Sequence, residues 1–294
     1  MRRRIARSAV LALLGVVALL ATAASQSPDR PARFSMIVSG QGPDVVLIPG
    51  LATPGDVWDA TVTQLAPSHR VHVARVAGFG GVDAGINKDE GDILPALVTE
   101  MAQYVAGLKR PAVIGHSLGG LIALEVAAQK PDAIGRVLVV DALPFFALTM
   151  SPDATVDTVK QMATMIRNQV MAQTDAQYSA RAPMTAARLA KSASARASVA
   201  KWAAASDRTV VAKAMYEDMM TDARPRLPQI TATTTVLYAF DATMGLPQAA
   251  IDSMYSRAYS GLAGADLRRI GGSYHFIMLD QPEAFAREID AFVK

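Results

Sequence analysis

Short runs of apolar, β-branched residues alternate with longer helix-forming stretches, and this alternation limits the folds open to the chain. Two of the runs, Val45-Val46-Leu47-Ile48 and Val137-Leu138-Val139-Val140, are apolar throughout. A strand that is apolar on both faces fits a sheet covered on both sides. Strands that alternate with helices favour a mostly parallel sheet with helices on its faces. The sequence therefore predicts an α/β fold.

The expected elements follow from apolar periodicity, β-branched residues and turn residues. Seven strands are expected at residues 33–38, 44–48, 70–76, 111–115, 136–141, 233–240 and 265–270. Helices between and after them are expected at residues 55–65, 92–108, 118–129, 247–259 and 282–293.

The alternation stops between Asp141 and Thr233, where the sequence is Ala-rich, helix-favouring and interrupted by prolines. We interpret residues 145–230 as a helical cap inserted into a core made of residues 25–144 and 231–294. The insertion follows the carboxyl end of a strand. In open α/β sheets this is the edge where ligands bind, so the cap is expected to cover the site.

The first 24 residues resemble a secretory signal. Arg2, Arg3 and Arg4 precede an apolar run at residues 9–21, and small residues follow up to Ala24. This order is typical of a signal peptide cleaved after Ala23 or Ala24. The alternative is an uncleaved anchor, although a membrane span needs about 20 apolar residues. Either way the domain is expected to be secreted or periplasmic, with membrane contact only through an uncleaved leader.

Charge and cysteine content exclude several classes of function. The chain has 29 basic and 26 acidic residues, and four of the arginines lie in the first seven positions. Removing those four leaves 25 basic against 26 acidic residues, a net charge of −1, so no nucleic-acid partner is expected. The chain has no cysteine, which excludes disulfides, thiolate metal sites and a cysteine nucleophile.

The most specific local motif is Gly115-His116-Ser117-Leu118-Gly119, which joins an expected strand to an expected helix. This is the setting of a nucleophile elbow, a turn so tight that residues two before and two after the serine must be glycine. Such a turn exposes the Ser117 hydroxyl near the amino end of the helix, where the helix dipole favours negative charge. We therefore expect Ser117 to be the nucleophile.

A serine nucleophile needs a base, and the chain has four histidines, His69, His72, His116 and His275. His116 is expected to leave the elbow toward packing, and His69 and His72 flank an early strand. Only His275 follows the last expected strand, where its loop returns to the edge that carries Ser117. A neutral imidazole there can accept the serine proton.

The imidazole needs an acid on its other nitrogen. Asp241 ends the strand after the cap, which gives the chain order nucleophile, acid, base, and it is our preferred candidate. Asp141, at the end of the strand before the cap, is the rival. Asp280 precedes Gln281-Pro282-Glu283, which indicates a helix N-cap with a reciprocal glutamate.

An acyl-transfer site also needs two N–H donors for an oxyanion. One is expected at Leu118, directly after the nucleophile. The other is expected at Leu51, in the loop that begins Pro49-Gly50, because Gly50 lets the backbone approach closely. The glycine-rich residues 77–81 lack the pattern of a phosphate-binding loop and indicate a flexible loop at a strand end.

With these motifs the chain resembles the α/β-hydrolase superfamily from about residue 33 to the end. The resemblance rests on residues 45–58, the elbow, the strand before Asp241 and residues 275–285. It implies about eight strands in a mostly parallel sheet with a helical cap. It also implies that Ser117, Asp241 and His275 form the triad, with Leu51 and Leu118 as oxyanion donors.

The sequence departs from the family pattern in two places. Pro49 stands where many relatives have histidine, and Tyr274 stands where many have a small residue. Relatives that open epoxides or remove halides use an aspartate nucleophile, so Ser117 argues against both activities.

The expected function is hydrolysis of a small carboxylic ester through an acyl-enzyme, with no metal or organic cofactor required. An aminopeptidase-like amidase, a lactonase and a carbon–carbon bond hydrolase are alternatives on the same fold. A non-catalytic ligand-binding protein is the alternative from another class, and it has no need of all three triad groups.

Overall fold

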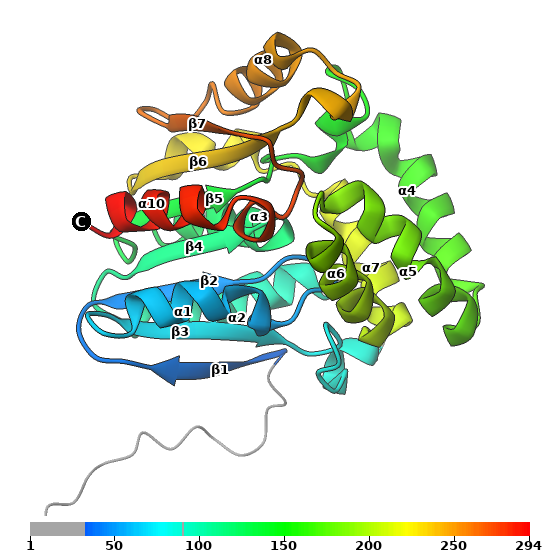
Figure 1. Ribbon diagram of the computed structural model, residues 1–294, viewed down its shortest axis with the longest axis horizontal. Helices are drawn as coiled ribbons and strands as arrows, with labels where there is room; N and C mark the ends of the chain where they lie inside the picture. Colours follow the sequence, from blue (N-terminus) through cyan, green and yellow to red (C-terminus); the bar gives the residue numbers. More distant parts are fainter. Residues whose placement is uncertain (1–32, 90) are drawn as a thin grey trace, which may run out of the picture. The chain divides into compact units, whose positions relative to one another are not determined.

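Seven strands form one sheet in the part of the chain that the computed structural model describes, residues 33–89 and 91–294 (Figure 1). The strand order is β1-β3-β2-β4-β5-β6-β7, and only β1 runs antiparallel to its neighbour. This confirms the predicted mostly parallel α/β sheet. The strands are β1 (Phe34–Ser39), β2 (Asp44–Ile48), β3 (Arg70–Val76), β4 (Ala112–His116), β5 (Arg136–Val140), β6 (Thr233–Phe240) and β7 (Asp266–Gly271).

The apolar strands lie at the centre of the sheet. All five residues of β2 are buried, and alternate residues along it enter different halves of the core. Val46 and Ile48 face one half, whereas Val45 and Leu47 face the other. Residues 45–48 of the strand are all apolar because both of its faces are covered.

Helices cover both faces of the sheet. One face packs against α2 (Leu94–Ala106), α3 (Leu118–Gln129) and α8 (Gln248–Ala258). The other packs against α1 (Asp59–Leu65) and α10 (Pro282–Val293). Short elements η1 (Gly55–Trp58), η2 (Gly85–Lys88), η5 (Ala242–Met244) and α9 (Ile277–Asp280) lie in the connections.

Between β5 and β6 the chain forms helices only. They are η3 (Phe146–Thr149), α4 (Val156–Met171), α5 (Asp175–Leu189), α6 (Ala193–Ala205), α7 (Arg208–Met220) and η4 (Arg224–Gln229). Helix α4 packs on α7, and α5 packs on α6. Side chains cap the starts of the four α-helices, as the residue types Thr155, Thr174, Ser192 and Asp207 favour.

We refer to residues 145–230 as the cap. In Figure 1 its green and yellow helices lie beyond the ends of the parallel strands. Backbone bonds join it to the loops after two of them: Asp207 N–H donates to the Gly78 carbonyl, and Ala223 N–H donates to the Pro144 carbonyl. The cap thus lies over the carboxyl edge of the sheet.

The predicted signal segment, residues 1–24, lies outside the described residues. Within residues 33–89 and 91–294, no helix combines the length and apolar character needed to cross a membrane.

Candidate active site

Ser117 lies in the turn between β4 and α3 with φ of 54° and ψ of −125°. A positive φ is unfavourable for a residue with a side chain and persists only where the surroundings enforce it. Here the Ser117 N–H donates to the Val140 carbonyl of the neighbouring strand at 2.9 Å. The side chain is half-buried at the edge of the sheet.

Two glycines make this turn sterically feasible. A Cβ at Gly115 would lie 2.1 Å from the carbonyl oxygen of Gly119. A Cβ at Gly119 would lie 2.3 Å from the carbonyl oxygen of Ile48. No other residue fits either position without moving the backbone, which is the crowding that the sequence motif predicts.

His275 lies in the loop between β7 and α9, and its ring is bonded to Asp141. The distance from His275 Nδ1 to Asp141 Oδ2 is 2.7 Å, and the two side chains are 24% and 13% exposed. The other carboxylate oxygen, Oδ1, accepts from the Ala239 N–H at 2.8 Å and the Tyr255 hydroxyl at 3.1 Å. Asp141 is thereby fixed, and it orients the imidazole.

The preferred acid of the sequence analysis, Asp241, does not contact His275. Its carboxylate binds Lys191 Nζ at 2.6 Å and the backbone N–H of Thr243 at 2.9 Å. The hydrogen bond from Lys191, followed by those from Thr243, lowers the pKa of Asp241 to about 2. This carboxylate belongs to a separate ion pair.

Strand order explains the correction. Ser117 follows β4, Asp141 follows the adjacent strand β5, and Asp241 follows β6, which is one strand further away. Neighbouring strands lie about 4.8 Å apart. The prediction of Asp241 was wrong because chain order does not reveal which of two strand ends lies closer to the serine.

His116 packs against His275 and is hydrogen-bonded to its backbone. Its side chain is fully buried, and its ring centroid lies 4.6 Å from that of His275. His116 Nε2 lies 3.1 Å from the carbonyl oxygen of His275, so this nitrogen carries the proton and donates it. Burial, together with the nearby His275, holds the pKa of His116 well below its usual value. His116 is therefore a neutral residue that fixes the His275 backbone.

Ser117 and His275 lie at the same edge of the sheet. His116 links them, because it precedes Ser117 in the chain and its ring is hydrogen-bonded to the His275 carbonyl. Within the described residues, no hydrogen bond joins the Ser117 hydroxyl to the His275 ring. Catalytic hydrogen bonds of this type are often long in a free enzyme and shorten when substrate binds.

Gly50 brings the loop after β2 against the elbow. A Cβ at Gly50 would lie 3.0 Å from Ser117 Cβ and 3.0 Å from His116 Nδ1. Within the described residues, neither the Leu51 N–H nor the Leu118 N–H donates a hydrogen bond. Leu118 begins α3, whose amino end favours negative charge. These two N–H groups are thus available near Ser117.

The other two histidines lie away from the site. His72 is buried and bonded to Asp44 and Tyr104, at 3.0 and 2.7 Å. His69 is bonded to its neighbour Ser68. Within residues 33–89 and 91–294, no group of three or more His, Cys, Asp or Glu side chains could hold a metal ion.

Asp218 is an acidic residue near the site that the sequence analysis missed. It lies on α7 in line with Val211 and Ala214, both buried in the core, so it shares their inward face. Its carboxyl group is half-buried, and within the described residues no hydrogen bond to it contributes to its pKa. Burial raises the pKa of Asp218 to about 7, and the neighbouring His275 opposes that rise. A polar residue on an apolar stripe is the signal that could have found it.

Asp280 does not cap the last helix. Its carboxylate accepts backbone N–H groups of Lys191, Ser192 and Tyr274 at 2.9 to 3.2 Å. Helix α10 instead begins after Gln281 without a side-chain cap. The N-cap prediction was wrong because a tertiary contact uses the carboxylate.

A family model described as the alpha/beta hydrolase family matches residues 45–288, most of the chain. The chain belongs to the alpha/beta hydrolase family. The fold and the Gly-x-Ser-x-Gly elbow of this chain agree with that membership.

Curated relatives of this alpha/beta hydrolase include pimeloyl-[acyl-carrier protein] methyl ester esterases. That of Vibrio atlanticus is 36% identical over 115 residues, which make up 39% of this chain and 42% of the relative. That of Aeromonas hydrophila is 35% identical over 107 residues, 36% of this chain and 41% of the relative. The chain therefore matches less than half the length of these relatives.

Solved structures resemble the hydrolase over most of its length. A thermophilic esterase from Thermogutta terrifontis has a TM-score of 0.70 at 20% identity, covering 88% of this chain and 92% of that one. An enol-lactonase from Burkholderia xenovorans has a TM-score of 0.71 at 18% identity, covering 88% and 96%. At 18–20% sequence identity, these similarities show a shared fold alone.

Proposed function

We propose that this protein is a serine hydrolase that cleaves small carboxylic esters. The observation that carries the proposal is the His275–Asp141 pair beside the strained elbow at Ser117. In this mechanism Ser117 attacks the ester carbonyl while His275 Nε2 takes the serine proton. Asp141 holds the imidazole by its Nδ1–H and stabilises the imidazolium that forms.

The tetrahedral intermediate carries a negative oxygen that needs fixed donors. The backbone N–H groups of Leu51 and Leu118 are the proposed donors, because both are near Ser117 and free to bind a ligand. Removing a donor of this kind typically slows the reaction about 100-fold or more.

The remaining steps use the same groups. His275 returns its proton to the leaving alcohol as the carbon–oxygen bond breaks, which leaves Ser117 acylated. Water, deprotonated by His275, then attacks the acyl carbonyl. The bond from the acyl carbon to Ser117 Oγ breaks, His275 returns the proton to that oxygen, and the acid is released. No step needs a metal or an organic cofactor.

The ester substrate is supported by family membership and by the methyl ester esterase activity for which the curated relatives are named. The test is turnover of p-nitrophenyl butyrate by the wild type and by Ser117→Ala. We expect the variant to lose at least 1,000-fold in kcat/KM while it stays folded. Fluorophosphonate should label the wild type alone. Equal turnover or equal labelling would refute the assignment of Ser117.

Asp218 favours a second candidate, an aminopeptidase-like activity on substrates that carry an ammonium group. An unpartnered carboxylate near His275 can bind a cation and exclude neutral analogues. No comparable feature among residues 33–89 and 91–294 favours a lactonase or a carbon–carbon bond hydrolase.

The second candidate is tested with a pair of esters of similar size, one aminoacyl and one acyl. Because Asp218 has a pKa of about 7, it ionises as the pH rises from 6 to 8. The ratio of kcat/KM values, aminoacyl over acyl, should therefore increase severalfold over this range, because groups that act equally on both esters cancel in the ratio. Asp218→Asn should flatten it. A flat ratio in the wild type would exclude the second candidate.

We also propose that the protein is exported, because residues 1–24 have the order of a signal peptide. Mass spectrometry of the mature protein tests this proposal. A first residue at position 24 or 25 is expected, and an intact leader would favour the anchor alternative.

A further inference from the structure

We propose that Ser206, a cap residue, positions the oxyanion donor of Leu51 through a chain of hydrogen bonds. The inference rests on the proposed function, because it assigns a role at the same site. Ser206 does not touch the reacting atoms, so it is a positioning residue.

Ser206 lies between α6 and α7 and is 7% exposed. Its hydroxyl lies 3.2 Å from the Ala52 carbonyl oxygen and 2.9 Å from that of Trp202, so one proton is shared between the two acceptors. The same oxygen accepts the Gly80 N–H at 2.8 Å. A single cap side chain is thereby bonded to two loops of the core.

The bond to Ala52 continues toward Leu51 through two peptide groups. The Ala52 carbonyl shares a peptide group with the Thr53 N–H, which donates to the Gly50 carbonyl at 3.2 Å. The Gly50 carbonyl in turn shares a peptide group with the Leu51 N–H. Hydrogen bonds in such a chain polarise one another, and each fixes the plane of a peptide. The direction of the Leu51 N–H therefore depends on Ser206.

The loop needs this support because Ala52 has a φ of 55°, which is unfavourable for alanine. Within the loop, Thr53 supplies two of the holding bonds: its N–H binds the Gly50 carbonyl and its hydroxyl binds the Leu51 carbonyl at 3.0 Å. The Ala52 carbonyl is bound by the cap instead. Without Ser206, the strained residue loses the bond that fixes its carbonyl.

The loop at residues 77–81 reinforces the contact. A Cβ at Gly80 would lie 2.5 Å from Pro54, and a Cβ at Gly78 would lie 2.8 Å from Val210 of the cap. The glycine content of this segment predicts a flexible loop, whereas in the structure its glycines pack it closely between the cap and the core. Displacement of Ser206 would thus loosen the loop at residues 77–81 as well as the loop after β2, which carries Leu51.

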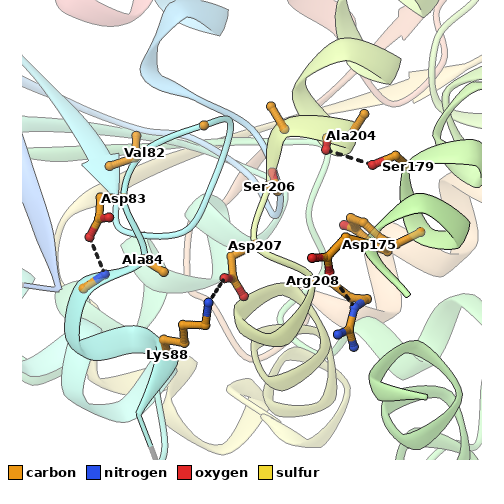
Figure 2. A pocket seen from close by; sticks show the side chains of 14 residues that line it. Val82, Asp83, Ala84, Lys88, Asp175, Ser179, Ala204, Ser206, Asp207 and Arg208 are labelled. Atoms are coloured by element: carbon orange, nitrogen blue, oxygen red, sulfur yellow. Dashed lines mark hydrogen bonds and ion pairs between the residues drawn. The ribbon is translucent and has the colours of Figure 1, made fainter. Parts of the chain in front are cut away.

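Figure 2 shows Ser206 at the side of a groove of about 550 Å³, which lies between the segment that follows this loop, residues 81–88, and the cap. In the same groove the Ser179 hydroxyl donates to the Ala204 carbonyl at 3.2 Å. That bond joins α5 to α6 inside the cap. Ser179 is therefore a matched control, a hydroxyl bonded to a backbone carbonyl without contact to the oxyanion loop.

The experiment compares Ser206→Ala with Ser179→Ala on p-nitrophenyl butyrate. We expect kcat to fall about tenfold in S206A with KM within twofold, because a misdirected donor weakens the transition state more than the ground state. The rate of fluorophosphonate labelling should fall by a similar factor. S179A should keep the wild-type kcat. Ser206→Thr, which retains the hydroxyl, should recover most of the activity.

Unchanged kcat in S206A, or equal losses in S206A and S179A, would overturn the proposal. If S206A does not fold, Ser206→Cys replaces it, because a thiol keeps the approximate size but is a weak donor. Wild-type kcat in S206C would then count against the proposal. Activity that does not require Ser117 would instead refute the proposed function, and this inference with it.

Discussion

Three residues beside the candidate site, Ala52, Ser117 and Asp141, have positive φ values although none is glycine. Each such residue costs about 1 kcal/mol or more. The surrounding hydrogen bonds sustain these conformations: Ser117 and Asp141 each donate their N–H groups to a neighbouring strand. The backbone is strained at the proposed nucleophile, at the proposed acid and in the proposed oxyanion loop, where the proposed function needs groups held in fixed directions.

Asparagine tolerates a positive φ nearly as well as aspartate does, so Asp141→Asn removes the charge with little change in the backbone. We expect kcat/KM to fall about 1,000-fold, because the imidazolium loses its counter-charge and the imidazole its preferred tautomer. Asp241→Asn should stay within about twofold, since Asp241 binds Lys191 instead. Ester kinetics on both variants check this, and equal losses would reverse the assignment of the acid.

At the scale of elements, the cap is joined to the core on both sides of the site. On one side Ser206 and Asp207 bind the loops after β2 and β3. On the other, Asp280 binds the start of α6 and the backbone beside His275. Four helices that follow one another in sequence are thus connected both to the loop after β2, the proposed oxyanion loop, and to the loop that carries His275.

Asp280→Asn leaves one acceptor oxygen for three backbone donors, Lys191, Ser192 and Tyr274. We expect a loss of about 2 kcal/mol, the range for hydrogen bonds to a charged group, which corresponds to a fall in Tm of about 4–8 °C. The control is Asp266→Asn, because its carboxylate is 48% exposed and pairs with Arg268 at the surface. Thermal unfolding followed by circular dichroism measures both, and equal Tm values for D280N and wild type would contradict this prediction.

At the scale of the whole molecule, the features that depend on nearby residues in the sequence could be predicted from local sequence patterns. The strands, the core helices and the elbow at Ser117 follow from periodicity and glycine spacing, and the sheet confirms the strands to within about one residue. The acid partner required the strand order, because Asp141 and Asp241 both end strands at the same edge. The hydrogen bonds of Ser206 and the electrostatic effect of His275 on Asp218 required the packing of the cap, which brings together residues more than 50 positions apart.

The bond between Ser206 and Ala52 has a practical consequence for chimaeras. Transplanting residues 145–230 from another protein would exchange the group proposed to direct the Leu51 N–H, together with the cap surface near the candidate site. A donor segment should therefore be aligned so that a hydroxyl arrives at the position of Ser206. Otherwise a low kcat of the chimaera would be attributed to its new substrate specificity, although the cause would be a misdirected backbone N–H group.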